Sequence, residues 1–259
     1  MINNSLNSTE SVDLIEKMVY DTLKTAGFRK FGRTLHRFVD GNISQVIHFQ
    51  NGCPGKGVFD VLWVNLGIRV PESAERSFVI KQQKKYYQEY ECNIRTRLGM
   101  LVDGEDTCYD LRDDPQIIGK DIMERIEKYV LPILDTLNSR QSILEHRREF
   151  SEFDKIGRSM ILLDEAMIYG HCGETELAGQ KFRQHYQKYC EEYQQKLHCG
   201  TKIYLRKGER ITYQNMRTNQ LETITAESDG EVVLYNAEVG HVRYLENLAE
   251  SLGIDLNFG

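Results

Sequence analysis

Three features that define other classes of protein are scarce or missing in this sequence of 259 residues: paired cysteines, long apolar runs and an excess of positive charge. The six cysteines are widely spaced and form no CxxC pair, which argues against a disulfide framework and favours free thiols in a reducing compartment. No window approaches the roughly 18 consecutive apolar residues of a membrane span, and residues 1–10 lack the apolar centre of a signal peptide. The formal net charge of -6 provides no positive field that would attract nucleic acid or anionic lipid. We therefore expect a cytoplasmic protein whose partners include neither nucleic acid nor a membrane.

The residues that are present are those of a folded globular protein. Hydrophobic residues make up 40% of the chain and charged residues 28%, a balance that argues against extended disorder. A chain of this length forms one or two domains, and its composition becomes more helical and charged from Ser139 onward. We therefore divide it into residues 1–138, an antiparallel-sheet α+β domain, and residues 139–259, a helical hairpin with C-terminal β strands and a closing helix.

A helix and then antiparallel strands are predicted for the first domain. Asn7 and Glu10 have the spacing of a capping box, and apolar residues recur at helical spacing from there to Gly27, which marks the helix end. Segments rich in β-branched and aromatic residues predict strands joined as hairpins at 33–39, 43–50 and 59–70, with a fourth strand at about 87–98.

Alternation within the third and fourth strands separates a core face from a polar face. The core face of the third strand carries Leu62, Val64, Leu66, Ile68 and Val70. Its opposite face carries Trp63, Asn65 and Arg69, and the polar face of the fourth strand carries Glu91, Asn93, Arg95 and Arg97.

Helices dominate the chain after the sheet. Pro115 stands at the start of a long helix that reaches Leu137, and Pro132 inside it predicts a kink about one turn earlier or a break into two helices. Later helices are expected at 143–150, 154–169, 174–197 and 242–252, and strands at 202–205, 210–215, 221–226 and 231–235. The fold class is therefore α+β: an N-terminal antiparallel sheet packed with helices, a helical hairpin region, and a small C-terminal β-hairpin and helix element.

Four segments in a fixed order carry a family resemblance. They are 26–34 (AGFRKFGRT), 46–50 (VIHFQ), 65–67 (NLG) and 91–99 (ECNIRTRLG), supported by 131–135 (LPILD) and 244–254 (YLENLAESLGI). Together they resemble the bacterial family of domains of unknown function numbered 4304, most clearly over residues 14–137. Asn93 stands where histidine is frequent in that family. Because the family has no established activity, the resemblance implies a fold and a bacterial origin rather than a reaction.

The polar face of the predicted sheet carries the most suggestive candidate site: Glu91, Asn93, Arg95 and Arg97, joined by Trp63, Asn65 and Arg69 from another strand. Two arginines one pleat apart can hold a carboxylate or phosphate by bidentate hydrogen bonds, and an adjacent aromatic ring can stack on a planar group. His48 projects away from its apolar neighbours and is a further candidate. The alternative is an ordinary polar sheet surface in which Glu91 pairs with Arg95, or a face covered by the C-terminal half.

No cofactor is expected. The histidines and cysteines between His171 and Cys199 supply zinc-ligand atoms, but as one helix this segment would separate its ends by on the order of 40 Å. His185 and Cys190, five residues apart, do not share a helix face. Aromatic residues at helical spacing in 174–197 indicate core packing, and they are also a candidate contact for a homodimer.

Two classes of function stay open. The absence of catalytic signatures favours a non-catalytic module that binds a protein partner or a small anionic ligand, with an immunity-type role as one form of it. The alternative is an enzyme acting on a phosphate- or carboxylate-bearing substrate, with Arg95 and Arg97 holding the anion and His48 or Glu91 as acid or base. That alternative requires His48, Glu91 and Arg95 to converge within hydrogen-bond reach.

Overall fold

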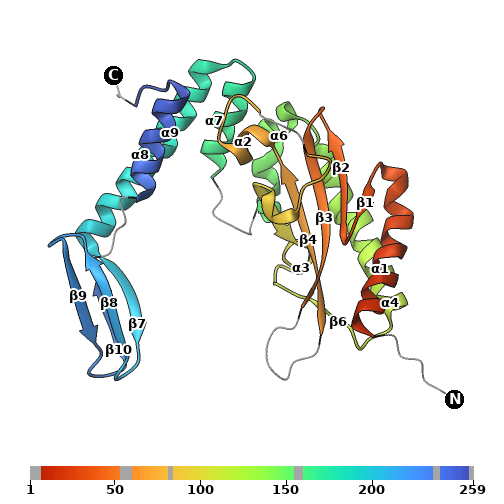
Figure 1. Ribbon diagram of the computed structural model, residues 1–259, viewed down its shortest axis with the longest axis horizontal. Coiled ribbons are helices and arrows are strands. Elements are labelled where there is room, and N and C mark those ends of the chain that lie inside the picture. The colour runs from red at the N-terminus through yellow and green to blue at the C-terminus, as the bar shows by residue number, and fades with distance from the viewer. Residues whose placement is uncertain (1–6, 53–59, 81–83, 155–159, 236–239, 257–259) are drawn as a thin grey trace. The chain divides into compact units, whose positions relative to one another are not determined.

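The computed structural model of the protein describes residues 7–52, 60–80, 84–154, 160–235 and 240–256. The chain forms two compact units, Met1–His171 and Cys172–Gly259. Figure 1 shows the first unit as a sheet flanked by helices, and the second as a long helix with a shorter helix and strands.

The first unit contains both helices and strands (Figure 1). Its α-helices are α1 (Ser8–Leu23), α2 (Pro71–Glu75), α3 (Leu98–Val102), α4 (Pro115–Arg125), α5 (Leu131–Thr136), α6 (Arg140–His146) and α7 (Ile161–His171). Its strands are β1 (Arg29–Phe31), β2 (Thr34–Val39), β3 (Ile43–Gly52), β4 (Val61–Arg69), β5 (Ile94–Arg97) and β6 (Tyr109–Asp110). Short 3₁₀ helices lie at η1 (Lys24–Ala26), η2 (Glu89–Glu91) and η4 (Arg147–Asp154), and a π-helical turn lies at η3 (Ile126–Val130).

Strands β1 to β6 form one antiparallel sheet, in the order β1-β2-β3-β4-β5 with β6 beside β4. The predicted hairpin strands correspond to β2, β3 and β4, although Phe59 at the predicted start of the third lies outside the described residues. The exposed three-residue edge strand β1 is absent from the sequence prediction. Helices α1 and α4 lie together on one face of the sheet (Figure 1). The predicted core face of β4 is confirmed, because it carries the buried residues Leu62, Val64, Leu66, Ile68 and Val70.

Local signals in the sequence set both ends of α1. The Asn7 side chain accepts a hydrogen bond from the backbone N–H of Glu10 at 3.0 Å, and the Glu10 carboxylate accepts one from the backbone N–H of Asn7 at 2.9 Å. This is the predicted capping box. At its other end α1 passes into the 3₁₀ helix η1, which ends at Gly27, whose φ of 86° is a left-handed conformation that glycine adopts without steric cost.

The long helix changes its winding just before Pro132. Helix α4 ends at Arg125, the π-helical turn η3 follows, and α5 begins at Leu131. Proline lacks a backbone N–H and its ring clashes with the carbonyl four residues earlier, so the preceding turn cannot keep regular α-helical bonding. The predicted interruption is therefore confirmed. Asp114 caps the start of α4, since its side chain accepts from the backbone N–H of Gln116 at 2.8 Å.

Residues 84–93 form a strap instead of the first part of the predicted fourth strand. Only Ile94–Arg97 is extended and paired as β5. Gln88 and Glu91 form a capping box around the short helix η2, and this box turns the chain before the strand begins. The prediction of a continuous strand over 87–98, with Glu91 and Asn93 on the same strand face as Arg95 and Arg97, is wrong for this reason.

The strap packs on the face of the sheet that the sequence predicts to be polar. Cys92 lies against Gly67, and the Tyr87 ring stacks on the Arg69 guanidinium, whose central carbon is 4.0 Å from the ring centroid. Asn65 and Arg69 are buried beneath this layer. The sheet is therefore covered on both faces near the end of β4.

Replacing Gly67 with alanine is expected to lower the free energy of unfolding by about 1–3 kcal/mol, the usual cost of overpacking a filled site. The added Cβ would lie 2.7 Å from Cys92 Sγ and 2.8 Å from Cys92 Cβ, so the strap would have to move. Urea unfolding followed by circular dichroism measures the loss. Gly230→Ala is the control, because a Cβ at that strand position meets nothing within 4 Å. Equal unfolding free energies for the two variants would contradict a close contact between strap and sheet.

Helix α6, the 3₁₀ helix η4 and helix α7 belong to the first unit. Ile143, Phe153 and Ile168 belong to the same hydrophobic core as the sheet. The Thr96 hydroxyl on β5 also donates to the backbone carbonyl of Glu152 at 3.0 Å. The compact units divide at residues 171 and 172. The domain boundary at 138 and 139, which follows the change in composition, stays a prediction.

The second unit contains helices α8 (Thr175–Cys199) and α9 (Gly240–Leu252) and strands β7 (Thr201–Leu205), β8 (Arg210–Asn215), β9 (Gln220–Thr225) and β10 (Gly230–Leu234). Strand β7 pairs with β10, and β8 pairs with β9, both antiparallel. Phe182 is fully buried, and the Tyr186 hydroxyl donates to Glu246 on α9 at 2.9 Å. Part of the predicted aromatic stripe therefore packs within the unit, and its use as a homodimer contact stays a prediction.

The predicted fold class is confirmed. The chain is α+β, with an antiparallel sheet packed with helices, then helices, then a small element of strands and a closing helix. Within the described ranges, no helix combines the length and the apolar character needed to span a membrane.

Candidate functional site

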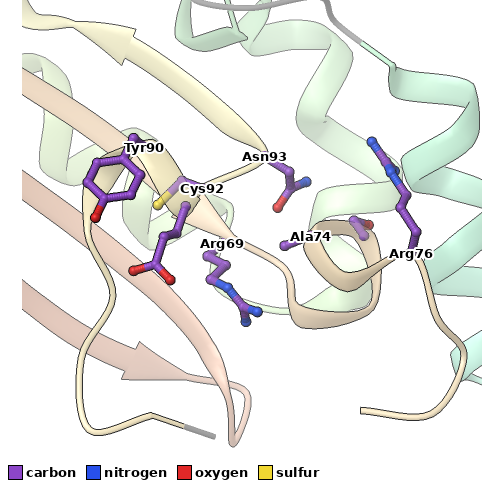
Figure 2. A pocket seen from close by; sticks show the side chains of 8 residues that line it. Arg69, Ala74, Arg76, Tyr90, Cys92 and Asn93 are labelled. Carbon is purple, nitrogen blue, oxygen red and sulfur yellow. The ribbon is translucent and has the colours of Figure 1, made fainter. Parts of the chain in front are cut away.

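A pocket of about 380 Å³ opens between the end of β4, helix α2 and the strap. It is lined by Arg69, Ser73, Ala74, Arg76, Tyr90, Glu91, Cys92 and Asn93. Figure 2 shows Arg69 between Tyr90 and Cys92 on one side and Ala74 and Arg76 on the other. The structure thus places three residues of the predicted polar face, Arg69, Glu91 and Asn93, in one pocket.

Arg69 is a buried cation in this pocket, with 6% of its surface exposed. Its Nη2 atom donates to Glu75 Oε1 at 2.8 Å, and the stacked Tyr87 ring fixes the plane of the guanidinium. Its Nη1 atom is buried and has no hydrogen-bond acceptor among the described residues. Leaving a buried donor without an acceptor costs about 1–3 kcal/mol, so an acceptor supplied from outside would recover that energy.

Asn93 offers a second donor of the same kind. Its Oδ1 atom accepts a hydrogen bond from the backbone N–H of Val70 at 2.8 Å, which fixes the orientation of the amide. The Nδ2 atom therefore points away from Val70. Like Arg69 Nη1, this atom is buried and has no acceptor in the part of the chain that the structure describes.

Glu91 brings a negative charge to the pocket. Its Oε1 accepts from Lys84 Nζ at 2.6 Å, and its Oε2 accepts from the backbone N–H of Gln88 at 2.9 Å. Burial by itself would raise the pKa of Glu91, but these two donors, with a smaller effect of the Arg69 charge, hold the pKa below its ordinary value. Glu91 is therefore an ionised carboxylate at neutral pH.

Arg76 and Ser73 form the wall contributed by α2. Arg76 follows the helix in a left-handed conformation, with φ of 51° and ψ of 48°, and its Nη1 donates to Asp164 Oδ1 at 2.6 Å. The Ser73 hydroxyl donates to the backbone carbonyl of Asp164 at 3.3 Å. The charge of Arg76 is thus balanced by Asp164, which leaves Arg69 as the lining cation with a buried donor to offer.

Trp63, Asn65 and Arg97 form a separate group on the same face of the sheet. Arg97 Nε donates to Asn65 Oδ1 at 3.0 Å, and the central carbon of its guanidinium lies 5.3 Å from the centroid of the Trp63 ring. Asn65 Nδ2 donates to Gln50 Oε1 at 2.8 Å, and Arg97 Nη1 pairs with Asp106 at 2.5 Å. The Asn65 amide and the Arg97 guanidinium thus have hydrogen-bond partners within the protein.

His48 and Arg95 also have partners within the protein. The Thr34 hydroxyl lies 3.0 Å from His48 Nδ1, and burial lowers the pKa of His48. Arg95 Nε donates to Glu89 Oε1 at 2.6 Å, whereas Glu91 pairs with Lys84. The predicted pairing of Glu91 with Arg95 is therefore replaced by two other ion pairs.

Several pocket residues are absent from the sequence prediction of the site, namely Ser73, Ala74, Arg76, Tyr90 and Cys92. A signal for three of them exists: Pro71 directly after a strand is typical of the first residue of a helix. A short helix there would have placed residues 73–76 beside the end of β4. Tyr90 had no such signal, because its 71% exposure follows from the turn within the strap.

The pocket contains polar groups suited to binding and offers no evident nucleophile. Burial raises the pKa of the Cys92 thiol, so that it stays protonated at neutral pH. Across the described ranges, no group of three or more His, Cys, Asp or Glu side chains is placed to hold a metal ion. What the pocket presents is a pair of donors suited to an anion, on Arg69 and Asn93, together with the Glu91 carboxylate and with the Arg76 guanidinium that is paired with Asp164.

Comparison with known proteins identifies a family for the segment that contains this pocket. No curated protein and no solved structure is similar enough to the chain to count as a match. Over residues 19–136, the chain matches the family described as Domain of unknown function (DUF4304), which confirms the resemblance found in the sequence.

Proposed function

We propose that the protein is a non-catalytic binding module whose pocket takes a small ligand with a carboxylate or phosphate group. One observation carries the proposal: Arg69 and Asn93 both line one pocket, and each has a buried donor, Nη1 and Nδ2, with no acceptor among the described residues. Hydrogen bonds from a guanidinium to an anion are among the strongest in proteins. The stacked Tyr87 ring holds the Arg69 guanidinium in place before a ligand arrives, which lowers the cost of binding.

The alternative, an enzyme that acts on such an anion, has less support. It requires His48, Glu91 and Arg95 to meet around a reacting group. Their hydrogen bonds lead instead to three different partners: Thr34, Lys84 and Glu89. We therefore propose binding without catalysis.

A protein partner is the second form of this proposal. The exposed Tyr90 ring lies at the pocket, and aromatic side chains of this kind are enriched in protein interfaces. A partner would then present an acidic side chain or a terminal carboxylate to Arg69. In this form the protein would be a bacterial cytoplasmic module of the immunity type.

Asn93→Asp is expected to weaken the binding of inorganic phosphate and of acetate by about tenfold or more, since a hydrogen bond to a charged group contributes on the order of 1.5–3 kcal/mol. The substitution keeps the oxygen that accepts from Val70 and replaces the Nδ2 donor with an anionic oxygen that repels the ligand. Titration of the full-length chain, followed by two-dimensional NMR of its amide signals, measures both affinities.

Gln116→Glu is the matched control for this experiment. It makes the same change of charge at an exposed position in the first turn of α4, outside the pocket. Phosphate and acetate affinities of the control should equal those of the wild type. Absence of binding to the wild type, or equal affinities for Asn93→Asp and Gln116→Glu, would refute the proposal.

A further inference from the structure

The pocket carries opposite charges that are not paired with each other. Arg69 pairs with Glu75 at 2.8 Å, and Glu91 pairs with Lys84 at 2.6 Å. Both Arg69 and Glu91 line the pocket, and the Arg69 charge contributes to the low pKa of Glu91. A ligand in this pocket therefore meets a positive and a negative group of the protein at the same time.

A plain anion matches only part of this arrangement. Its charge would be attracted by Arg69 but repelled by the ionised Glu91, whose own partner Lys84 has a side chain that is 63% exposed. A ligand with an additional positive charge would turn the repulsion into attraction. Salt bridges of exposed lysines contribute little to stability, so the Lys84 ammonium can give up its place at Glu91 at small cost.

We propose that the pocket binds a small zwitterion of the amino-acid class. The ligand carboxylate accepts hydrogen bonds from Arg69 Nη1 and Asn93 Nδ2, and the ligand ammonium takes the position of the Lys84 ammonium at Glu91. A volume of about 380 Å³ is within the range of small-molecule pockets. This inference rests on the proposed function, because it assigns the anionic end of the ligand to the same two donors.

Matched pairs of small acids test the inference with the full-length chain. Each pair consists of an amino acid and the acid of the same carbon chain without the amine: glycine with acetate, β-alanine with propionate, and 4-aminobutyrate with butyrate. In at least one pair the amino acid is expected to bind about tenfold more tightly than its partner, as one added charge-assisted hydrogen bond provides. The pair with the largest ratio reports which amine-to-carboxylate separation fits.

Glu91→Gln identifies the group that recognises the amine. Glutamine keeps an oxygen for the backbone N–H of Gln88, so the turn at η2 is retained, but it removes the negative charge. The preference for the amino acid should fall to about one in this variant, while binding of the plain acid is kept or improved. Asn93→Asp should weaken binding of both members of a pair.

The outcomes separate this inference from the proposed function. One outcome would refute the zwitterion inference alone: the wild type binds both members of every pair equally tightly, and Asn93→Asp weakens the binding of the plain acids. The proposal of an anion-binding pocket would then still hold. A preference for amino acids that survives in Glu91→Gln would also overturn the zwitterion inference. If no acid of either kind binds, the proposed function and this inference both fail.

Discussion

Replacing Asp164 with alanine is expected to lower the free energy of unfolding of the first unit by about 3–5 kcal/mol, as measured by urea denaturation. The Asp164 side chain is 1% exposed and accepts from Arg147 Nη1 at 2.7 Å and from Arg76 Nη1 at 2.6 Å. Removing the carboxylate takes a shared counter-ion from two guanidiniums, one of which is itself buried. The variant keeps the backbone carbonyl that accepts from Ser73 but removes the carboxylate that holds Arg76, so Arg76 loses its fixed position in the pocket wall.

Asp135→Ala is the control for the first prediction. Asp135 pairs with Arg37 at 2.5 Å, but its side chain is 62% exposed, and such surface pairs contribute at most about 1 kcal/mol. Similar losses of unfolding free energy in Asp164→Ala and Asp135→Ala would contradict the prediction that burial makes the Asp164 contacts more important for stability.

The contribution of Asp164 to the free energy of unfolding should also depend on pH. Burial alone would raise the pKa of Asp164, but the two guanidiniums hold it below its ordinary value of 3.8. The unfolded chain therefore takes up a proton at a higher pH than the folded one. The stabilisation is present above pH 3.8 and is lost as the pH falls through the lower pKa of the folded state. The difference in stability between the wild type and Asp164→Asn should accordingly narrow in acid.

The parts of the fold that could be predicted from the sequence depend on residues close together in the chain. The capping box at Asn7, the glycine that ends the helical segment α1–η1 and the effect of Pro132 each follow from one or two helical turns of sequence. The alternation in β4 is equally local, since its core face needs no knowledge of what covers it.

The strap shows where local patterns fail. Alternating polar and apolar residues between Tyr87 and Leu98 fit a strand, and a period of two does not tell a paired strand from an irregular segment packed across a sheet. The turn is set by Gln88 and Glu91, and Glu89 is then held by Arg95. Glutamine is not among the preferred N-cap residues, so this turn carried a weak signal.

Only some of the pocket residues could be predicted from the sequence, because the others are brought to the pocket by contacts between distant segments. Glu91 and Asn93 could be selected because they are polar residues at regular spacing. Their relation to Arg69 depends on the strap covering β4, and the place of Arg76 depends on Asp164, which lies 88 residues further along the chain. Contacts over such separations are properties of the folded chain and leave no periodic trace in a single sequence.

Replacing Arg140 with methionine is expected to destabilise the first unit by about 3–5 kcal/mol, because it leaves a buried carboxylate without its main partner. Arg140 Nε donates to Glu72 Oε1 at 2.8 Å, and Nη2 donates to Glu72 Oε2 at 2.9 Å. Glu72 on α2 is fully buried. The same guanidinium donates to Asp40 Oδ2 at 3.0 Å and to Asn42 at 2.7 Å, so it joins α6, α2 and the turn between β2 and β3.

Arg112→Met is the control that tests whether the loss of stability comes from the burial of the ion pair or only from its hydrogen-bond geometry. Arg112 contacts both carboxylate oxygens of Asp110, as Arg140 does with Glu72, but its side chain is 58% exposed. Replacing Arg112 should lower the free energy of unfolding by at most about 1 kcal/mol.

Arg140→Lys should lower the free energy of unfolding by an amount between those of Arg140→Met and Arg112→Met, because an ammonium keeps the charge but cannot form the two-pronged contact. The double variant Glu72→Met with Arg140→Met should recover much of the loss by removing the buried charge altogether. Additive losses in the double variant, or equal losses for Arg140→Met and Arg112→Met, would show that the stability of α2 does not depend on this ion pair.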